Sequence, residues 1–407
     1  MTPNVTGTGF AGQVKDGIFM RNIFMLSEKV DPNALSEAFK RTMADCPYFA
    51  QTMVMENGLL VYKEYEPDLT IHPLEEEAGI GGGYGRPLVY VCAGEKTIVV
   101  GISHALTDGF GNNLFCHVLL YHYFCIRDGQ NYPLPKEFTL AGAIELDTSS
   151  DLLGDLDPAG DPAPCSPCLS LAPGEEGPDG SFAVSIDAAA FKRASKEALG
   201  LSDDSYEEIN RGLFPIGGIA CLFTYLMLAR AIQKSRPENT LPIGCRFPVN
   251  MRYILHKPHA VRNFSAPQAV LSLVPDKLNA ENWTEKDTRR LYERLQSELT
   301  AENLVADLAD VKDSALGGKR PPSPAVIAKF TAPTMLVTNI GALAWEPAFG
   351  RITHAEGEYG GFPCKIQITK HEDRQVLYMM QTFASDTYFK GILKELELVG
   401  IGDFQIF

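Results

Sequence analysis

The sequence Gly101-Ile-Ser-His-Ala-Leu-Thr-Asp-Gly-Phe110 lies where a run rich in valine and isoleucine gives way to polar residues. The run over residues 97–103 predicts a buried strand that ends directly before His104. Asp108 and Gly109 follow, so an imidazole, a carboxylate and a residue suited to sharp turns lie close together. Imidazole titrates near neutral pH, and it can take a proton from a hydroxyl or amine and return it to a leaving group. We interpret the segment as a catalytic loop; the plainer alternative is a structural histidine with a satisfied hydrogen bond.

The elements around this loop indicate a mixed α and β lobe. Asp31 and Pro32 supply an N-cap and a first helical position, and apolar side chains then recur at every fourth residue. Asn57-Gly58 separates two strand-like runs, and this dipeptide accepts the positive φ angles of a tight hairpin turn. The expected elements are a helix from residue 32, a hairpin of 51–55 and 59–65, a strand pair of 88–93 and 97–103, and a helix after the loop.

The second half of the chain also mixes helices and strands, without the strict alternation of a Rossmann sheet. Asp187 can cap a helix that ends at Gly200, and Thr284-Glu-Lys-Asp287 resembles a capping box. Residues 215–234 are apolar enough for a long buried helix. Strands are expected over 269–274, 334–338, 365–369 and 376–382.

A window rich in proline and glycine divides the chain. Residues 148–181 hold six prolines and five glycines in 34 positions, a composition typical of a linker. The whole chain has 407 residues, enough for two domains. We expect an N-terminal lobe at 1–150 that carries the His104 loop, a crossover linker at 151–180 and a C-terminal lobe at 181–407.

Charge and hydropathy exclude several classes of partner. Basic residues number 36 and acidic residues 51, a net charge of −15 that opposes nonspecific binding to nucleic acid. The most apolar stretch, 216–229, is shorter than the roughly 20 residues that span a bilayer. The first residues lack the basic and apolar regions of a secretory signal, and nine cysteines, an odd number, fit reduced thiols. We expect a cytoplasmic protein with no nucleic-acid partner and no membrane span.

Several segments together resemble the chloramphenicol acetyltransferase-like superfamily, which includes nonribosomal peptide condensation domains, plant BAHD enzymes and microbial alcohol acyltransferases. His104 to Gly109 match its His-x-x-x-Asp-Gly motif. Ile243-Gly-Cys-Arg-Phe-Pro-Val-Asn-Met-Arg252 is similar to the family segment that ends in an arginine paired with the motif aspartate, and Val261-Arg-Asn-Phe264 resembles the following Gly-Asn-Phe strand. Two residues depart from the pattern: Ser103 replaces the first histidine of the double-His form, and Arg262 replaces a glycine. The Asp-Phe-Gly-Trp-Gly signature of the BAHD branch is absent from the sequence.

The resemblance implies an α/β fold of two two-layer sandwich lobes, a pseudo-dimer with a tunnel open at both faces. His104 would lie midway along this tunnel as the general base, and no acyl-enzyme would form. Asp108 would be architectural, held by a structural ion pair with Arg252 that aims the histidine, while Gly109 would let the chain turn tightly. Candidate donors to the oxyanion are Ser265, Thr338 and Asn339, and candidate contacts to the donor's phosphates are Lys319 and Arg320.

The resemblance also implies the reaction. We expect an acyl-CoA-dependent O-acyltransferase, similar to alcohol acetyltransferases, in which a hydroxyl attacks the thioester directly. The alternatives are a condensation-type enzyme that forms amides from carrier-protein thioesters, a noncatalytic binding protein on the same fold, and a hydrolase with water as acceptor. The expected partners are a small-molecule alcohol or amine and, in the condensation case, an acyl carrier protein. Acyl-CoA or a phosphopantetheinyl thioester is a co-substrate, no bound cofactor is expected, and Cys165-Ser-Pro-Cys168 lacks the second ligand pair of a metal site.

Overall fold

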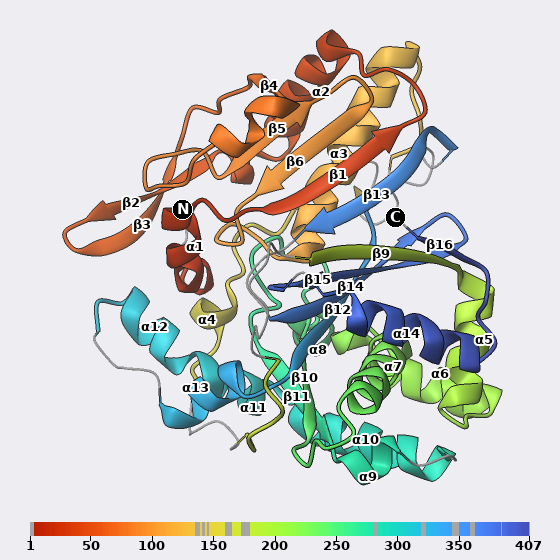
Figure 1. Cartoon of the computed structure of the whole chain (residues 1–407). Helices are drawn as coiled ribbons and strands as arrows, with labels where there is room; N and C mark the ends of the chain where they lie inside the picture. The colour runs from red at the N-terminus through yellow and green to blue at the C-terminus, as the bar shows by residue number, and fades with distance from the viewer. Residues whose placement is uncertain are drawn as a thin grey trace.

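The computed structural model describes residues 4–134, 139–140, 143–144, 146–158, 165–171, 180–279, 283–318, 323–343, 350–358, 363–383 and 385–406. Figure 1 shows two lobes, each a β-sheet with helices packed on it. The chain is therefore a mixed α/β protein of two lobes, as the sequence predicts.

The first lobe is built on a five-stranded sheet in the order β13-β1-β6-β5-β4. Helices α2 (Pro32–Asp45) and α3 (Gly109–Asp128) pack against each other, and their buried side chains join those of the strands in one apolar core. The strands are β1 (Met20–Leu26), β4 (Ile71–Pro73), β5 (Val89–Ala93), β6 (Thr97–Ile102) and β13 (Ile352–Glu358).

Local sequence signals place the outer elements of this lobe. The Asp31 carboxylate accepts hydrogen bonds from the backbone N–H groups of Asn33 at 2.9 Å and Ala34 at 3.0 Å, so the predicted N-cap of α2 is confirmed. The hairpin of β2 (Gln51–Glu56) and β3 (Leu59–Glu64) is confirmed as well. Its turn residues Asn57 and Gly58 have φ angles of 53° and 80°, the left-handed values that a tight hairpin needs.

The second lobe is built on a seven-stranded sheet in the order β11-β10-β12-β14-β15-β9-β16. Helices α5 (Ala188–Ala198), α7 (Ile219–Ser235) and α14 (Thr387–Leu398) bury their apolar side chains with those of the strands in a second core. The strands are β9 (Gly180–Asp187), β10 (Ile243–Pro248), β11 (Gln268–Leu273), β12 (Met335–Ala342), β14 (Cys364–His371), β15 (Arg374–Gln381) and β16 (Phe404–Ile406).

The predicted long helix is present as α7 but begins at Ile219 rather than at residue 215. Gly217 and Gly218 have φ angles of 92° and 75°, which no α-helix accepts, and the Asn210 side chain accepts from the Ile219 N–H at 2.9 Å. Most of α7 is buried, as its apolar sequence predicts. Over the described parts of the chain, no helix combines the length and apolar character that crossing a membrane requires.

Strand β13 links the two lobes. It comes from the segment expected to form only the C-terminal lobe, yet it pairs antiparallel with β1, from Arg21 opposite Glu358 to Leu26 opposite Ile352. Figure 1 shows it, in blue, beside the red β1. The expected boundary at residue 181 therefore does not separate the two sheets. A local sequence pattern reports a strand but not its partner, which explains the difference.

The remaining elements connect the lobes or cover their edges. Helix α10 (Glu285–Glu298) begins with the predicted capping box of Thr284 and Asp287. The linker contributes α4 (Leu152–Asp155), whose two leucines are buried in the second core. The others are η1 (Thr6–Phe10), α1 (Ala11–Asp16), η2 (Pro47–Phe49), η3 (Leu74–Gly79), β7 (Thr139–Leu140), β8 (Ala143–Ile144), α6 (Asp203–Gly212), η5 (Phe214–Ile216), α8 (Met251–Leu255), α9 (Pro275–Leu278), α11 (Ala301–Val305), η6 (Ala306–Leu308), α12 (Ala309–Ala315) and α13 (Pro324–Thr331).

Candidate active site

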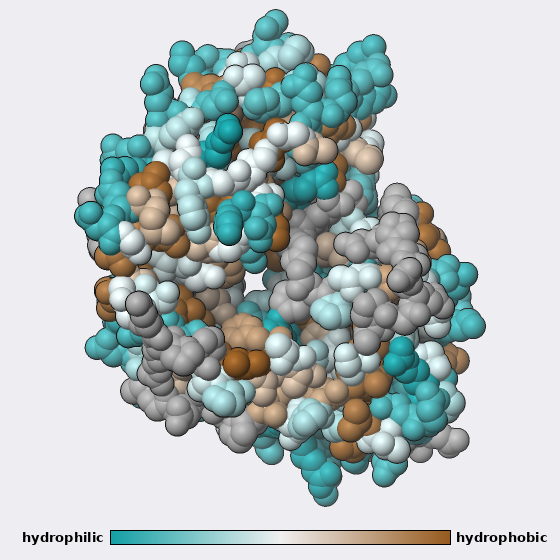
Figure 2. All heavy atoms as spheres, turned by 60° about the vertical axis from the view of Figure 1, so that its left-hand side comes forward, coloured by the Kyte–Doolittle hydropathy of each residue, from teal (hydrophilic) through white to brown (hydrophobic). Residues whose placement is uncertain are grey.

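A cavity of about 810 Å³ lies where the two lobes meet. Figure 2 shows a hollow between the upper and lower parts of the molecule. The first lobe contributes Phe10, the loop between β6 and α3 with His104, and the start of α3. The second lobe contributes β10, β12 and β14 together with α5 and α6. A cavity of this size between two lobes is a typical position for a small-molecule site.

His104 stands at the end of β6 and reaches this cavity. Its Nδ1 lies 3.1 Å from the carbonyl oxygen of Thr107, which can only accept, and this contact favours the tautomer with the ring proton on Nδ1. This tautomer leaves the lone pair on Nε2. The ring stacks on Phe10 with centroids 4.8 Å apart, and the Asn263 amide lies 3.2 Å from Nδ1 and donates to the His104 carbonyl at 3.4 Å. The imidazole is therefore fixed in one orientation.

The environment of His104 keeps its ring neutral. The pKa of His104 is lowered to about 4, mainly by burial and in part by the positive charge of Lys365, against the opposing effect of Asp108. A neutral imidazole with its lone pair on Nε2 is the form that can accept a proton.

Asp108 does not compete for that proton, because its carboxylate is fully paired. Arg252 Nη1 lies 2.7 Å from Oδ2 and Nη2 lies 3.0 Å from Oδ1, and both side chains are buried. Oδ2 also accepts from the Phe264 N–H at 2.9 Å and the Ser265 hydroxyl at 2.8 Å. Burial alone would raise the pKa of Asp108, but Arg252 and these donors hold it below its ordinary value.

The Asp108–Arg252 pair fixes the loop that carries His104. Asp108 Oδ1 accepts from the N–H groups of Phe110 at 3.1 Å and Gly111 at 3.3 Å, and so caps the start of α3. Arg252 also donates to the carbonyl oxygens of Ala260 and Arg262, each at 2.7 Å. One ion pair thus ties the β6–α3 loop to the segment between β10 and β11.

Gly109 is the first residue of α3, and its importance is spatial. A Cβ at this position would lie 3.0 Å from Cγ2 of Ile340, which comes from β12 of the other lobe. Its φ angle is not in the left-handed region. The absence of a Cβ at Gly109 therefore lets α3 and β12 approach each other.

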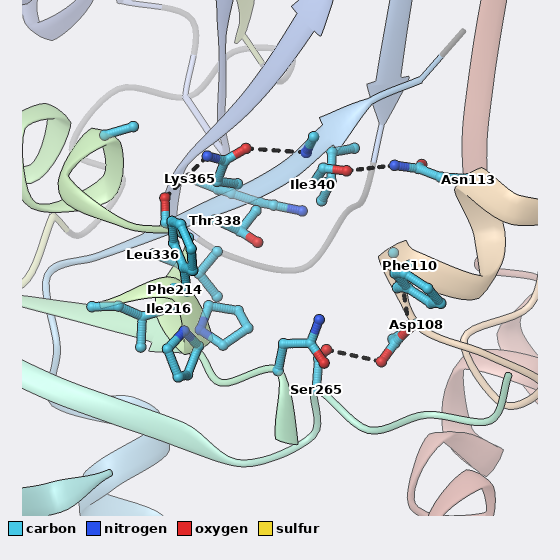
Figure 3. A pocket seen from close by; sticks show the side chains of 18 of the residues that line it. Asp108, Phe110, Asn113, Phe214, Ile216, Ser265, Leu336, Thr338, Ile340 and Lys365 are labelled. Carbon is cyan, nitrogen blue, oxygen red and sulfur yellow. Dashed lines mark hydrogen bonds between the residues drawn. The ribbon is translucent and has the colours of Figure 1, made fainter. Parts of the chain in front are cut away.

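The three oxyanion candidates all line the cavity, but their hydrogen-bonding groups differ. The Ser265 hydroxyl donates to Asp108, and the Asn339 amide donates to the Gly217 carbonyl at 3.0 Å while its oxygen accepts from Gly341 at 3.0 Å. Among the described residues, none hydrogen-bonds to the Thr338 hydroxyl, which Figure 3 shows inside the cavity. The two candidates for donor phosphates, Lys319 and Arg320, lie outside the described residues.

Two buried cations that the sequence analysis missed also line the cavity. Lys365 on β14 is 5% exposed and Arg246 on β10 is 3% exposed. Burial lowers the pKa of Lys365 to about 7 and that of Arg246 to about 10. The signal was available: in Cys364-Lys-Ile-Gln-Ile-Thr369 polar and apolar residues alternate, so the lysine lies on the face opposite the apolar core.

Comparisons with solved structures give the fold. No protein-family model matches the sequence, and no curated protein matches it. F. sporotrichioides TRI101 complexed with coenzyme A and T-2 matches with a TM-score of 0.63 and 12% identity over 99% of both chains. The first condensation domain of the CDA synthetase matches with a TM-score of 0.61 and 14% identity, over 98% of this chain and 95% of that one. Polyketide synthase associated protein 5 from Mycobacterium tuberculosis matches with a TM-score of 0.56 and 14% identity over 97% of both chains. The chain therefore shares its two-lobe fold with TRI101 and with condensation domains.

Proposed function

We propose that this chain transfers an acyl group from acyl-CoA to a hydroxyl acceptor, with His104 as the general base. The observation that carries the proposal is the His104 ring, held by the Thr107 carbonyl so that Nε2 keeps its lone pair, in a cavity between two lobes. Proteins of the same fold support an acyl-transfer reaction, since they include TRI101 complexed with coenzyme A and condensation domains.

The proposed reaction is a single displacement at the thioester carbonyl. The acceptor hydroxyl gives its proton to Nε2 of His104 while its oxygen forms a bond to the carbonyl carbon. The resulting tetrahedral oxyanion collapses and breaks the C–S bond. The imidazolium then returns the proton to the departing thiolate, which leaves an ester and free CoA. No bond to the protein forms at any step.

The buried setting of His104 suits both proton transfers. At neutral pH the ring is neutral and ready to accept, because its pKa is about 4. Negative charge that develops on the oxyanion in the same cavity favours the imidazolium during the reaction. Once the oxyanion has collapsed, burial again favours the neutral ring, which drives the proton onto sulfur.

We assign the oxyanion contact to Thr338, because its hydroxyl faces the cavity and no described residue hydrogen-bonds to it. Ser265 supports the site through Asp108, and Asn339 through its contacts with Gly217 and Gly341. Lys319 and Arg320 remain proposed contacts to the phosphates of CoA. Their replacement by alanine should raise KM for acyl-CoA without changing KM for the corresponding acyl-pantetheine, which lacks the nucleotide.

Product analysis tests the reaction class. Acyl-CoAs of increasing chain length are incubated with a panel of alcohols and amines, and released thiol and acylated products are measured by absorbance and mass spectrometry. Ester formation supports the proposal. Amide formation from carrier-protein thioesters favours the condensation-type alternative, free acid without acceptor indicates a hydrolase, and binding without turnover indicates a noncatalytic protein.

A further inference from the structure

Phe10 reaches His104 from the N-terminal segment of the chain. It is the last residue of η1 and directly precedes α1, and its ring lies nearly parallel to the imidazole, with centroids 4.8 Å apart and planes 13° apart. A parallel stack covers a face of the imidazole and leaves uncovered the ring edge, where the nitrogen lone pairs lie. Phe10 also lines the cavity between the lobes. The stack therefore places an aromatic face against the proposed base without covering its Nε2.

The η1 turn is attached to the loop that carries His104. The Asn4 amide donates to the carbonyl oxygen of Ala105 at 3.0 Å, and the Gly7 N–H donates to the Asn4 side chain at 2.9 Å. Gly7 packs so closely against the same carbonyl oxygen that a Cβ there would overlap it. These contacts hold the turn, and with it Phe10, beside the imidazole.

The contact between the two rings gains strength when His104 takes a proton. A neutral imidazole is attracted to a phenyl ring by stacking alone, whereas a cation within about 6 Å of the ring centroid is also drawn to the negative ring face. This attraction is larger where water is excluded, and His104 lies in such a setting, because burial is the main cause of its lowered pKa. An interaction that is stronger in the transition state than in the ground state raises the rate.

We propose that Phe10 acts through His104, as a positioning residue whose ring face stabilises the imidazolium by a cation–π contact during the reaction. The inference rests on the proposed acyl transfer, in which the ring is positive only between accepting the acceptor's proton and passing it to sulfur. The phenyl face and the oxyanion both favour the imidazolium at that stage. The positive charge of Lys365 acts in the opposite direction.

Fluorinated phenylalanines test the inference at nearly constant ring shape. Replacement of Phe10 by 4-fluoro-, 3,5-difluoro- or 3,4,5-trifluorophenylalanine draws electrons from the ring face while adding little volume. With the best acyl-CoA and alcohol pair, kcat/KM should fall stepwise, to about a tenth of the wild-type value with three fluorines. The same series at Phe19, which lines the cavity but packs edge-on against Tyr90, is the matched control and should leave kcat/KM unchanged. A kcat/KM that does not follow the number of fluorines on Phe10 would overturn the inference.

The pKa of His104 gives a second readout, with a sign that packing alone would not produce. A contact that favours the imidazolium raises this pKa, so Phe10→Leu should lower it below about 4, and Phe10→Trp, whose ring face attracts cations more strongly, should raise it. A mere loss of packing in Phe10→Leu would raise the pKa instead, because water at the ring would weaken the effect of burial. NMR titration of labelled histidine between pH 3 and 8, on protein verified as folded, measures the pKa, and His104→Gln assigns the signal. An upward shift in Phe10→Leu, or no shift in either variant, would overturn the inference.

The charged groups around the ring are the same throughout the fluorine series. Those of Asp108 and Lys365 act on the His104 pKa directly. The other titratable or charged groups on the elements packed around the loop and along the cavity are Tyr48, Tyr62, His117, Asp151, Lys192, Tyr206, Arg246, Arg252, Tyr253 and Arg262. A trend with the number of fluorines therefore reports the ring face of Phe10.

The two measurements separate this inference from the proposed function. A His104 pKa that follows the substitutions at Phe10, in a protein that transfers no acyl group, would uphold the cation–π contact and reject the acyltransferase. Acyl transfer whose rate is insensitive to fluorination of Phe10, with an equally insensitive His104 pKa, would retain the acyltransferase and reject the contact.

Discussion

At the residue scale, the Thr107 carbonyl favours one tautomer of His104. With the proton on Nδ1, Nε2 would be the base of the proposed reaction, while Phe10 stacks on the ring. The sequence analysis proposed His104 as the base, but it could not supply the tautomer, because the tautomer depends on a backbone carbonyl three residues further along. Lys365 and Arg246 were not predicted, although the alternation of polar and apolar residues over 364–369 was a signal for the lysine.

The pH dependence of the reaction should reflect the buried ring. The base must be neutral, so kcat/KM for an uncharged substrate should fall on the acid side with an apparent pKa near 4, the value to which burial lowers His104. Lys365→Met removes a positive charge that lowers this pKa, and the acid limb should then move upward. The profile is measured between pH 3.5 and 8, with near-ultraviolet circular dichroism to verify folding at each pH. An acid limb at pH 6.5 in the wild type would indicate an exposed imidazole.

Asp108→Asn should lower both the stability of the protein and the rate of the proposed acyl transfer. The change leaves Arg252 buried without its counter-ion, and such losses commonly amount to about 3–5 kcal/mol. Urea unfolding of the variant measures the free energy of unfolding. Asp45→Asn, which removes a half-exposed carboxylate beside His122, is the control and should change stability by less than about 1 kcal/mol. A fully stable and active Asp108→Asn protein would refute the architectural role.

Thr338→Val should separate catalysis from stability. If the hydroxyl donates to the oxyanion, kcat should fall by about 10²- to 10³-fold with little change in melting temperature. Ser265→Ala is the comparison, because its hydroxyl is bonded to Asp108 and its loss should lower the melting temperature more than Thr338→Val does. Steady-state kinetics and thermal unfolding of both variants decide the assignment. An unchanged kcat in Thr338→Val would exclude the Thr338 hydroxyl as the donor to the oxyanion.

At the element scale, the start of α3 and strand β12 meet at Gly109 and Ile340. Gly109→Ala should crowd this contact, since the new methyl group would lie 3.0 Å from Ile340 Cγ2 and the Ile340 side chain would have to shift. We expect about a tenfold loss of kcat/KM. Ile340→Ala removes the clashing methyl group, so the double variant should recover most of the activity that Gly109→Ala loses. If the loss of kcat/KM in the double variant equals the product of the losses in the two single variants, the contact between Gly109 and Ile340 is unimportant.

Elements were predictable where their signals are local. The Asp31 cap, the Asn57-Gly58 turn and the Thr284 capping box each place an element correctly, because the residues that determine it are neighbours in sequence. The start of α7 was wrong by four residues, since it depends on the backbone angles of Gly217 and Gly218. No local sequence pattern indicated that β13 pairs with β1, because the two strands lie far apart in the sequence.

At the scale of the whole molecule, the lobes are joined by backbone pairing rather than by the linker alone. Strand β13 completes the first sheet against β1, and two side chains of α3 bridge to β12: Asn113 donates to the carbonyls of Ile340 and Ala342, and His117 Nε2 donates to Ala342 at 3.0 Å. The cavity that holds His104 therefore depends on both lobes being present.

Residues 1–150 expressed alone should not form a stable lobe. Without β13, the edge of β1 is exposed as an unpaired strand, and apolar residues of the core lose Ile352 and Ala355. Circular dichroism and size-exclusion chromatography should show a poorly folded, associating fragment, and coexpression with residues 151–407 should restore a soluble complex. A monodisperse fragment with cooperative unfolding would contradict this dependence.

Proton transfer by His104 is the central step of the proposed acyl transfer. The most direct measurement is kcat/KM of His104→Ala relative to the wild type with the best acyl-CoA and alcohol pair, with His122→Gln, a histidine of α3 that pairs with Asp45, as control. We predict a loss of about 10²- to 10⁴-fold for His104→Ala, the usual contribution of a general base, and near-normal transfer for the control. Transfer by a correctly folded His104→Ala protein within about threefold of the wild-type rate would contradict the mechanism.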